Sequence, residues 1–224
     1  MDHRLAADFA HRFKISVEHV VRESYEMHLL WALFESRLGR ALVFKGGTAL
    51  RLAYGSPRFS DDLDFSIVAP VPDETFVAVV KTVNEGLPQV TMVEALAKRF
   101  TLFALFKVSE AYLPQPFSIK LEISTRPETW ERGRDVELRL LASDFTNVTV
   151  LAQVATLERM WADKQTAVAD RRQPRDLYDL WFITQKLRRE FSVELAGFDR
   201  QAIRRELRKY LPRSHWGVIE QWTE

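Results

Sequence analysis

Two segments in which apolar and polar residues alternate strictly constrain the fold more than any other feature of the sequence. Residues 62–68 are DLDFSIV and residues 117–124 are FSIKLEIS. Successive side chains of a β-strand point to opposite faces of a sheet, so each segment would bury one apolar face. The opposite face of the first strand carries Asp62 and Asp64, and that of the second carries Glu122. If the two strands are neighbours, these three carboxylates share one polar face.

The remaining patterns predict a mixed region of helices and strands, followed by a helical region. Further strands are expected at Ala41–Phe44, Thr101–Ser109 and Asn147–Leu151, and helices at Ile15–Ser36, Thr48–Tyr54 and Asp73–Glu85, with Thr48 and Asp73 as caps. From about Gln153 the chain is predicted to be helical, with breaks near Pro174, Gly197 and Pro212. The predicted fold class is therefore α+β, with one domain over 1–150 and a basic helical domain over 151–224.

Composition excludes several classes of protein. The 224 residues are 46% hydrophobic and 28% charged, as in an ordinary globular protein. The chain has no cysteine, which excludes a disulfide framework, a zinc–thiolate site and a cysteine nucleophile. Its longest apolar run, Leu29–Phe34, is far shorter than the ~20 residues that span a membrane. The N-terminus lacks the pattern of a signal peptide, so we expect a soluble, cytoplasmic protein without a membrane partner.

The charges are unevenly distributed along the chain. The net charge is only +1, but residues 159–213 contain 14 basic and 8 acidic residues, a local net charge of +6. The rest of the chain contains 18 basic and 23 acidic residues, a net charge of −5. A basic C-terminal region suits a polyanionic partner such as a nucleic acid. A solvated helical surface rich in arginine would have the same composition.

The carboxylates of the two alternating strands are candidate metal ligands. Asp62 and Asp64 lie one strand pitch apart and repel each other unless a cation lies between them. Carboxylate oxygens suit Mg²⁺ or Mn²⁺, and with Glu122 as a third ligand the cluster could hold two such ions. The alternative is an exposed acidic edge strand, in which Glu122 forms a salt bridge with Lys120 or another basic neighbour.

A second candidate site is the sequence Lys45-Gly46-Gly47-Thr48, which precedes Asp62 by fourteen positions at a predicted junction of strand and helix. Glycines at such a junction let a phosphate approach the backbone, and the free N–H groups of a helix start attract anions. Thr48 adds a hydroxyl donor. The spacing of a P-loop is absent, and a Gly-Gly pair is also common in simple turns.

Further candidates lie on the predicted C-terminal helices. Lys164 falls within the inward apolar stripe of the helix over Gln153–Arg171, which contains Val154, Leu157, Trp161 and Val168. A buried lysine beside a carboxylate cluster suits a triphosphate. Asp176 and Asp179 lie in the first turn of the next helix, where the helix dipole is itself a sufficient reason for acidic residues.

Two residues beside the acidic strand complete the set of candidates. Arg58 and Ser60 precede Asp62 and are close enough in sequence to reach a nucleotide bound there. The alternative for Arg58 is a simple ion pair with Asp61.

Taken together, these motifs resemble a known family. The segments 44–50 (FKGGTAL) and 58–65 (RFSDDLDF) are similar to the first motif of the AbiEii/AbiGii-type toxins, which are related to the MenT toxins and, more distantly, to polymerase-beta-like enzymes. The segment 120–124 (KLEIS) resembles the later strand of that family. Lys164 with 175–181 (RDLYDLW) resembles its downstream motifs. The matched segments extend over residues 44–181 in the expected order.

The resemblance implies a nucleotidyltransferase fold, with a mixed sheet, flanking helices and a C-terminal helical bundle. It implies a metal-dependent transfer of a nucleoside monophosphate from an NTP (ATP, GTP, CTP or UTP), with release of pyrophosphate. Asp62 and Asp64 would bind Mg²⁺, Gly47 and Thr48 the terminal phosphates, and Lys164 the triphosphate or the acceptor. The implied acceptor is RNA, in particular the 3′ end of tRNA, whose modification blocks translation and growth. The implied partner is a cognate antitoxin encoded nearby.

Two positions depart from the family pattern, and two other functions compete. Thr48 stands where many nucleotidyltransferases have serine, and Glu122 is one methylene longer than the usual aspartate. The same chemistry could act on a protein or small-molecule hydroxyl. A non-catalytic domain of this fold could instead bind RNA or a protein, although it would have no physical reason to keep Asp62 and Asp64 together.

Overall fold

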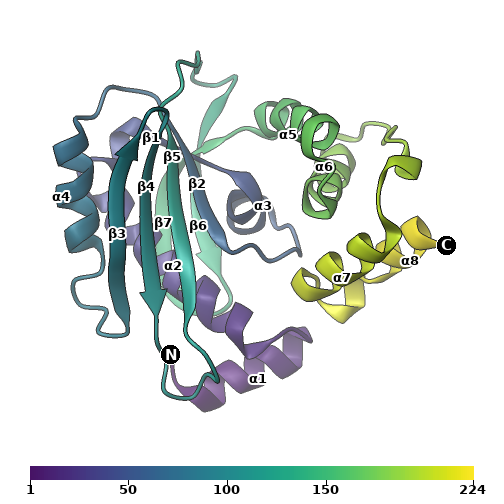
Figure 1. Cartoon of the computed structure of the whole chain (residues 1–224), viewed down its shortest axis with the longest axis horizontal. Coiled ribbons are helices and arrows are strands. Elements are labelled where there is room, and N and C mark those ends of the chain that lie inside the picture. The colour runs from purple at the N-terminus through teal and green to yellow at the C-terminus, as the bar shows by residue number, and fades with distance from the viewer.

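The computed structural model describes all 224 residues, Met1–Glu224, and is built on one seven-stranded mixed sheet (Figure 1). The strand order is β3-β4-β5-β2-β1-β7-β6. Strands β2 and β5 pair in parallel, as do β1 and β7, and the other neighbours are antiparallel. The strands are β1 (Leu42–Lys45), β2 (Asp62–Ile67), β3 (Val90–Lys98), β4 (Thr101–Val108), β5 (Phe117–Ser124), β6 (Val136–Ser143) and β7 (Thr146–Ala155).

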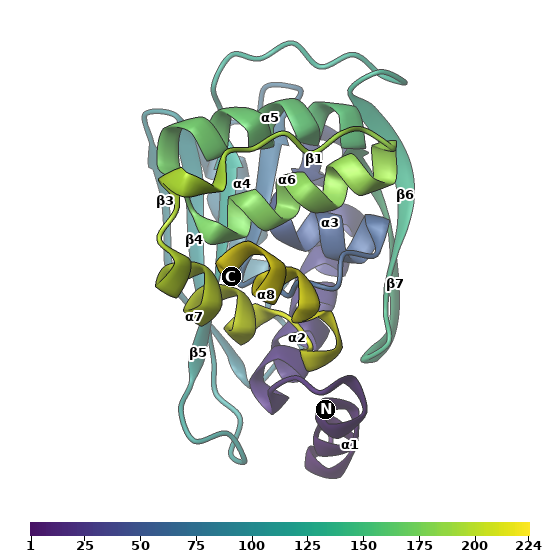
Figure 2. The same cartoon turned by 90° about the vertical axis from the view of Figure 1, so that its right-hand side faces the viewer.

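Helices cover both faces of this sheet. In Figure 1, α4 lies on one side, while α5 to α8 gather on the other, and Figure 2 shows α5 and α6 crossing in front of the strands. None of the helices combines the length and the apolar character that a membrane-spanning segment requires. The helices are α1 (His3–Phe13), α2 (Val17–Glu35), α3 (Gly46–Tyr54), α4 (Asp73–Val83), α5 (Leu157–Arg171), α6 (Pro174–Leu187), α7 (Arg200–Tyr210) and α8 (Gly217–Thr223).

The alternation in β2 and β5 separates an apolar face from a polar one, as predicted. Leu63 and Phe65 of β2 are buried, and so are Ile119, Leu121 and Ile123 of β5. The apolar face packs on the core that contains α2, where Phe34 lies 6.1 Å from Phe65 between ring centroids. Because every second side chain points the other way, the carboxylates of both strands face the C-terminal helices.

Several predicted boundaries were wrong. Strands β3 and β6 and helix α1 were not predicted. The alternation of β3 is interrupted at Met92 and Val93, where its pairing with β4 is irregular. Strand β6 was missed although its residues 136–140 (VELRL) alternate strictly. The first C-terminal helix begins at Leu157 rather than Gln153, because β7 runs through residue 150 to Ala155. Val154 is therefore part of the sheet and not of the inward stripe of that helix.

The predicted caps were also wrong. Lys45, not Thr48, occupies the N-cap position of α3, and Pro72, not Asp73, occupies that of α4. Neither helix has a side-chain hydrogen bond at its cap. The first backbone N–H groups of α3 therefore have no side-chain acceptor.

Candidate active site

Strands β2 and β5 bring the three predicted carboxylates together. The two strands are direct neighbours, with Asp64 opposite Glu122 and Asp62 opposite Lys120. Asp62, Asp64 and Glu122 line one small cavity of about 160 Å³. Lys120 pairs with Asp62, with 3.7 Å between Nζ and Oδ1, and not with Glu122. The predicted acidic cluster therefore exists, and two neighbouring strands form it. Asp64 and Glu122 lie opposite each other although they are 58 positions apart in the sequence.

The electrostatics of this cluster favour a cation. Burial, and next the charge of Asp62, raise the pKa of Asp64 to about 6, and Glu122 acts in the same direction. Lys164 and Lys45 oppose the shift without cancelling it. The carboxylates do not converge on a single point that would define a metal position. Their donor chemistry nevertheless fits Mg²⁺ or Mn²⁺, because all three supply hard oxygen ligands at a site where negative charge is unfavourable.

The Gly46-Gly47 turn lies directly against the acidic strand. Gly46 has a φ of +82°, and Asp64 Oδ2 occupies the space that a Cβ at this position would need. A Cβ on Gly47 would meet the guanidinium of Arg58 and would lie 2.7 Å from Ser60 Oγ. Only glycine allows the start of α3 to approach the carboxylates this closely. The uncapped N-terminus of α3 therefore opens beside the acidic cluster, where it can bind an anion.

The Thr48 hydroxyl has a structural role that the sequence did not predict. Its hydroxyl is buried and donates to the backbone carbonyl of Asp62 at 2.6 Å. The hydroxyl proton is therefore directed at β2 and not at the cavity. A phosphate at this site would meet the backbone N–H of Thr48 rather than its side chain.

Lys164, Arg58, Asp176 and Asp179 form a buried ion network. Lys164 Nζ lies 2.7 Å from Asp176 Oδ1 and 2.7 Å from Asp179 Oδ2. Arg58 donates two bonds to Asp179, of 2.7 and 2.8 Å, and Arg171 approaches Asp176 at 3.1 Å. Although burial acts the other way, Arg58 and Lys164 hold the pKa of Asp179 below its usual value. This network fixes α5 and α6 to the loop that precedes β2.

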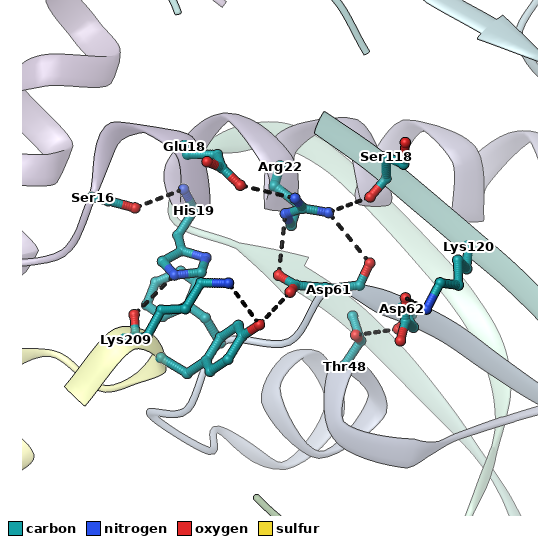
Figure 3. A network of polar contacts seen from close by, with 12 residues as sticks. Ser16, Glu18, His19, Arg22, Thr48, Asp61, Asp62, Ser118, Lys120 and Lys209 are labelled. Atoms are coloured by element: carbon teal, nitrogen blue, oxygen red, sulfur yellow. Dashed lines mark hydrogen bonds and ion pairs between the residues drawn. The ribbon is translucent and has the colours of Figure 1, made fainter. Parts of the chain in front are cut away.

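The alternative pairing of Arg58 with Asp61 is wrong. Arg58 lies in the network with Asp179, while Asp61 pairs with Arg22 of α2 at 3.3 Å and accepts a hydrogen bond from Tyr210. Figure 3 shows Arg22 between Asp61, Glu18 and the carbonyl of Ser118, to which it donates at 2.6 Å. Sequence reasoning missed this contact. No signal in the sequence singles out Arg22 for this contact, since Glu18 and Glu26 lie four positions away on either side as ordinary helical partners.

Basic side chains surround the carboxylates. The 160 Å³ cavity is also lined by Ser60, Arg171, Arg175 and Tyr210. A larger cavity of about 630 Å³ shares Asp64, Glu122, Lys164 and Arg171 with it and adds Lys45, Gly46 and Arg126. We call the two cavities together the acidic cleft. Arg126, Arg171 and Arg175 were not predicted as site residues, since only their position in the fold distinguishes them from other exposed arginines.

Comparison with known proteins identifies the family. The family model described as "Nucleotidyl transferase AbiEii toxin, Type IV TA system" matches residues 28–221, most of the chain. This chain belongs to the AbiEii nucleotidyltransferase toxin family. No curated protein sequence matches it significantly.

Solved structures support the same fold for this AbiEii chain. MenT4, a nucleotidyltransferase toxin from Mycobacterium tuberculosis, is 20% identical, with a TM-score of 0.63 over 100% of this chain and 87% of MenT4. JHP933 from Helicobacter pylori is 21% identical, with a TM-score of 0.56 over 84% of this chain and 72% of its own. A putative nucleotidyltransferase from H. pylori gives 21% identity and a TM-score of 0.57, covering 84% and 74% of the two chains.

These findings confirm the resemblance stated from the motifs and the expected nucleotidyltransferase fold. Membership of the AbiEii family assigns the chain to the nucleotidyltransferases of type IV toxin–antitoxin systems, and it implies an antitoxin as partner.

Proposed function

We propose that this AbiEii protein transfers a nucleoside monophosphate from an NTP to an RNA hydroxyl, at the 3′ end of tRNA, and so blocks translation and growth. The acceptor oxygen bonds to the α-phosphorus, the bond from that phosphorus to the β-phosphate oxygen breaks, and pyrophosphate leaves. The hydroxyl proton passes through the carboxylate cluster to water. The observation that carries this proposal is the meeting of Asp62, Asp64 and Glu122 beside the uncapped N-terminus of α3.

Asp62, Asp64 and Glu122 are the residues that would hold Mg²⁺ or Mn²⁺, with two ions as the expected number. When bound, the ions would stabilise the negative charge on the reacting oxygens. The first backbone N–H groups of α3, at Gly46, Gly47 and Thr48, would bind the terminal phosphates.

Other cleft residues would assist in binding the nucleotide. Lys45 and Lys164 add positive charge beside the carboxylates, and Ser60 lines the cavity with a hydroxyl group. Asp176 and Asp179 would act on the nucleotide by holding Lys164 in place, because both pair with its ammonium group. Arg58 would act one step further away, by holding Asp179. We propose that the strand region supplies this chemistry and that the basic helical region contacts the acceptor.

The chemistry of the cleft supports RNA as the acceptor. Arg171 and Arg175 line it from helices α5 and α6, and Arg126 lines it from the segment that follows β5. Neutralisation of phosphates by arginine and lysine supplies most of the non-specific affinity for nucleic acids. The residues 159–213 that carry these helices have a net charge of +6.

The test incubates the pure protein with each α-labelled NTP, Mg²⁺ and total cellular RNA. We expect label in a tRNA-sized band for the wild type and none for Asp64→Ala. Asp144→Ala, an exposed carboxylate in the turn between β6 and β7, is the matched control and keeps activity. If the label appears in protein or in a small molecule, that molecule and not RNA is the acceptor. If no NTP labels anything, the protein is a non-catalytic domain that binds RNA or protein.

A further inference from the structure

A second large cavity lies outside the acidic cleft. It has a volume of about 960 Å³ and is lined by residues 10–19, at the junction of α1 and α2, and by residues 208–216, at the end of α7 and the 3₁₀ turn that follows. It shares no residue with either cavity of the cleft. In Figure 3, His19 on the side of α2 points to Lys209 on the other wall, and His19 Nε2 lies 2.9 Å from the Lys209 carbonyl. This bond holds the two walls together.

The charge of this cavity is strongly positive. Lys14, Arg208, Lys209 and Arg213 line it with exposed side chains, against a single carboxylate, Glu18. Four cations and one anion give a net charge of +3, and Glu18 is already paired with Arg22 at 2.9 Å.

None of these four cations takes part in an ion pair, although eleven other lysines and arginines of the chain do. Like charges gathered without counter-ions repel one another, so an anion with several charges would bind here favourably.

An aromatic ring lies among these cations. Trp216 is half-buried, and the guanidinium carbons of Arg208 and Arg213 lie 4.9 and 5.8 Å from its ring centroid. The indole N–H donates to the Leu211 carbonyl at 3.1 Å, which fixes the orientation of the ring. Fixed aromatic rings flanked by arginines are surfaces on which unpaired bases stack. Of the other lining residues, only Ala10, Ile15 and Leu211 are hydrophobic, unlike the mostly apolar lining of a small-molecule pocket.

The basic cavity leads to the acidic cleft through two consecutive residues. Lys209 lines the cavity and Tyr210 lines the cleft. Lys209 Nζ lies 3.0 Å from the Tyr210 hydroxyl, which in turn donates to Asp61, the neighbour of Asp62. A chain of phosphates bound in the cavity therefore needs to pass only the end of α7 to reach the carboxylates.

From these observations we infer that the cavity between residues 10–19 and 208–216 binds the phosphate backbone of a single-stranded segment of the acceptor RNA, with one base stacked on Trp216. The inference rests on the proposed function for the identity of the acceptor. It adds the site at which that acceptor is held.

The first test measures binding alone, without NTP or metal. A fluorescein-labelled, 20-nucleotide single-stranded RNA of mixed sequence is titrated with wild-type protein and with the double variant Arg208→Glu/Arg213→Glu. We expect at least a tenfold loss of affinity at 0.1 M salt, and a fall of about 1.4 in the slope of log K against log salt for two lost phosphate contacts. Lys81→Glu/Lys107→Glu, on exposed positions of α4 and β4, makes the same change in net charge and should alter affinity by less than threefold.

The stacking contact has its own variant. Trp216→Leu should lower the affinity for RNA about tenfold and leave the salt slope unchanged, because it removes no charge. Circular dichroism and thermal unfolding of each variant separate loss of a contact from loss of the fold. If Trp216→Leu unfolds the protein, Arg208→Gln/Arg213→Gln still tests the cavity through the salt slope.

A transfer assay then tests the link between the two sites. The cavity variants should raise the KM for RNA at least tenfold and leave the KM for NTP unchanged. If the cavity double variant and the control double variant lose RNA affinity equally, the inference is wrong, even if RNA is the acceptor. Loss of RNA binding in the cavity variants only, in a protein that labels no RNA, would instead overturn the proposed function and leave the binding site in place.

Discussion

The hydroxyl of Tyr210, the last residue of α7, donates a hydrogen bond to the carboxylate of Asp61, which directly precedes the first residue of β2. The other oxygen of Asp61 faces Arg22 of α2 at 3.3 Å. Helices α7 and α2 thus both contact the residue next to Asp62. The position of the acidic cluster therefore depends on the packing of elements that lie at opposite ends of the chain.

Replacement of Tyr210 by phenylalanine tests this link. Tyr210→Phe removes the hydrogen bond donated to Asp61 and the one accepted from Lys209, and it leaves Asp61 paired with Arg22. We therefore expect a loss of about 1–2 kcal/mol in the free energy of unfolding. Nucleotidyl transfer should fall about tenfold because Asp62 is less well positioned. Tyr112→Phe is the matched control, since its hydroxyl donates to the Met1 carbonyl at 3.0 Å and lines neither cavity of the acidic cleft. Equal transfer rates for the two variants would show that Asp61 does not position the cluster.

The pKa of Asp64 predicts a pH-dependent stability. The pKa of about 6 in the folded protein lies above the ordinary aspartate value of 3.8, so the folded state loses stability as the pH rises from about 4 to 6. Asp64→Asn should therefore be more stable than wild type by about 3 kcal/mol at pH 8, with the difference vanishing below about pH 4. Urea unfolding in the presence of EDTA from pH 4 to 8 measures the difference. A constant difference across that range would contradict the shifted pKa.

Gly46 and Gly86 offer a matched pair for the glycine turn. Their φ angles are +82° and +84°. A Cβ added to Gly46 would collide with the side chain of Asp64, whereas a Cβ added to Gly86 would meet no other atom. Gly86→Ala should cost about 1 kcal/mol of stability through backbone strain alone and leave activity intact. Gly46→Ala should cost more and abolish transfer, because Asp64 must move. Chemical denaturation and the transfer assay, run on both variants, make the comparison.

The ion network around Asp179 should be important for stability. Asp179→Asn leaves the buried charges of Arg58 and Lys164 with one counter-ion fewer, which typically costs about 3–5 kcal/mol. Asp170→Asn, at an exposed position of α5, should change stability by less than about 0.5 kcal/mol. Thermal unfolding of the two variants tests this. A small effect at Asp179 would mean that solvent reaches the network.

The parts of the fold that could be predicted are those specified by local periodicity. The alternation in β2 and β5 gave both strands to within a residue and identified Asp62, Asp64 and Glu122 as a group. The edge strand β3 was not predicted because its alternation is broken at Met92 and Val93. Strand β6 was not predicted although residues 136–140 alternate, and its apolar residues do not all face the core: Leu138 is 67% exposed. The cap of α3 was assigned to Thr48 because the sequence does not show that α3 begins at the glycines.

By itself, the sequence determined the acidic strand, the glycine turn before a helix and the later lysine, since each depends on residues that are neighbours along the chain. Only the tertiary structure decided how the charges are paired. Arg58 bonds Asp179, 121 positions away, and Tyr210 bonds Asp61, 149 positions away, although nearer partners were available in sequence. The physical reason is that a buried charge pairs with whatever opposite charge the packing of helices and sheet brings within about 3 Å, and that packing is set by the whole chain.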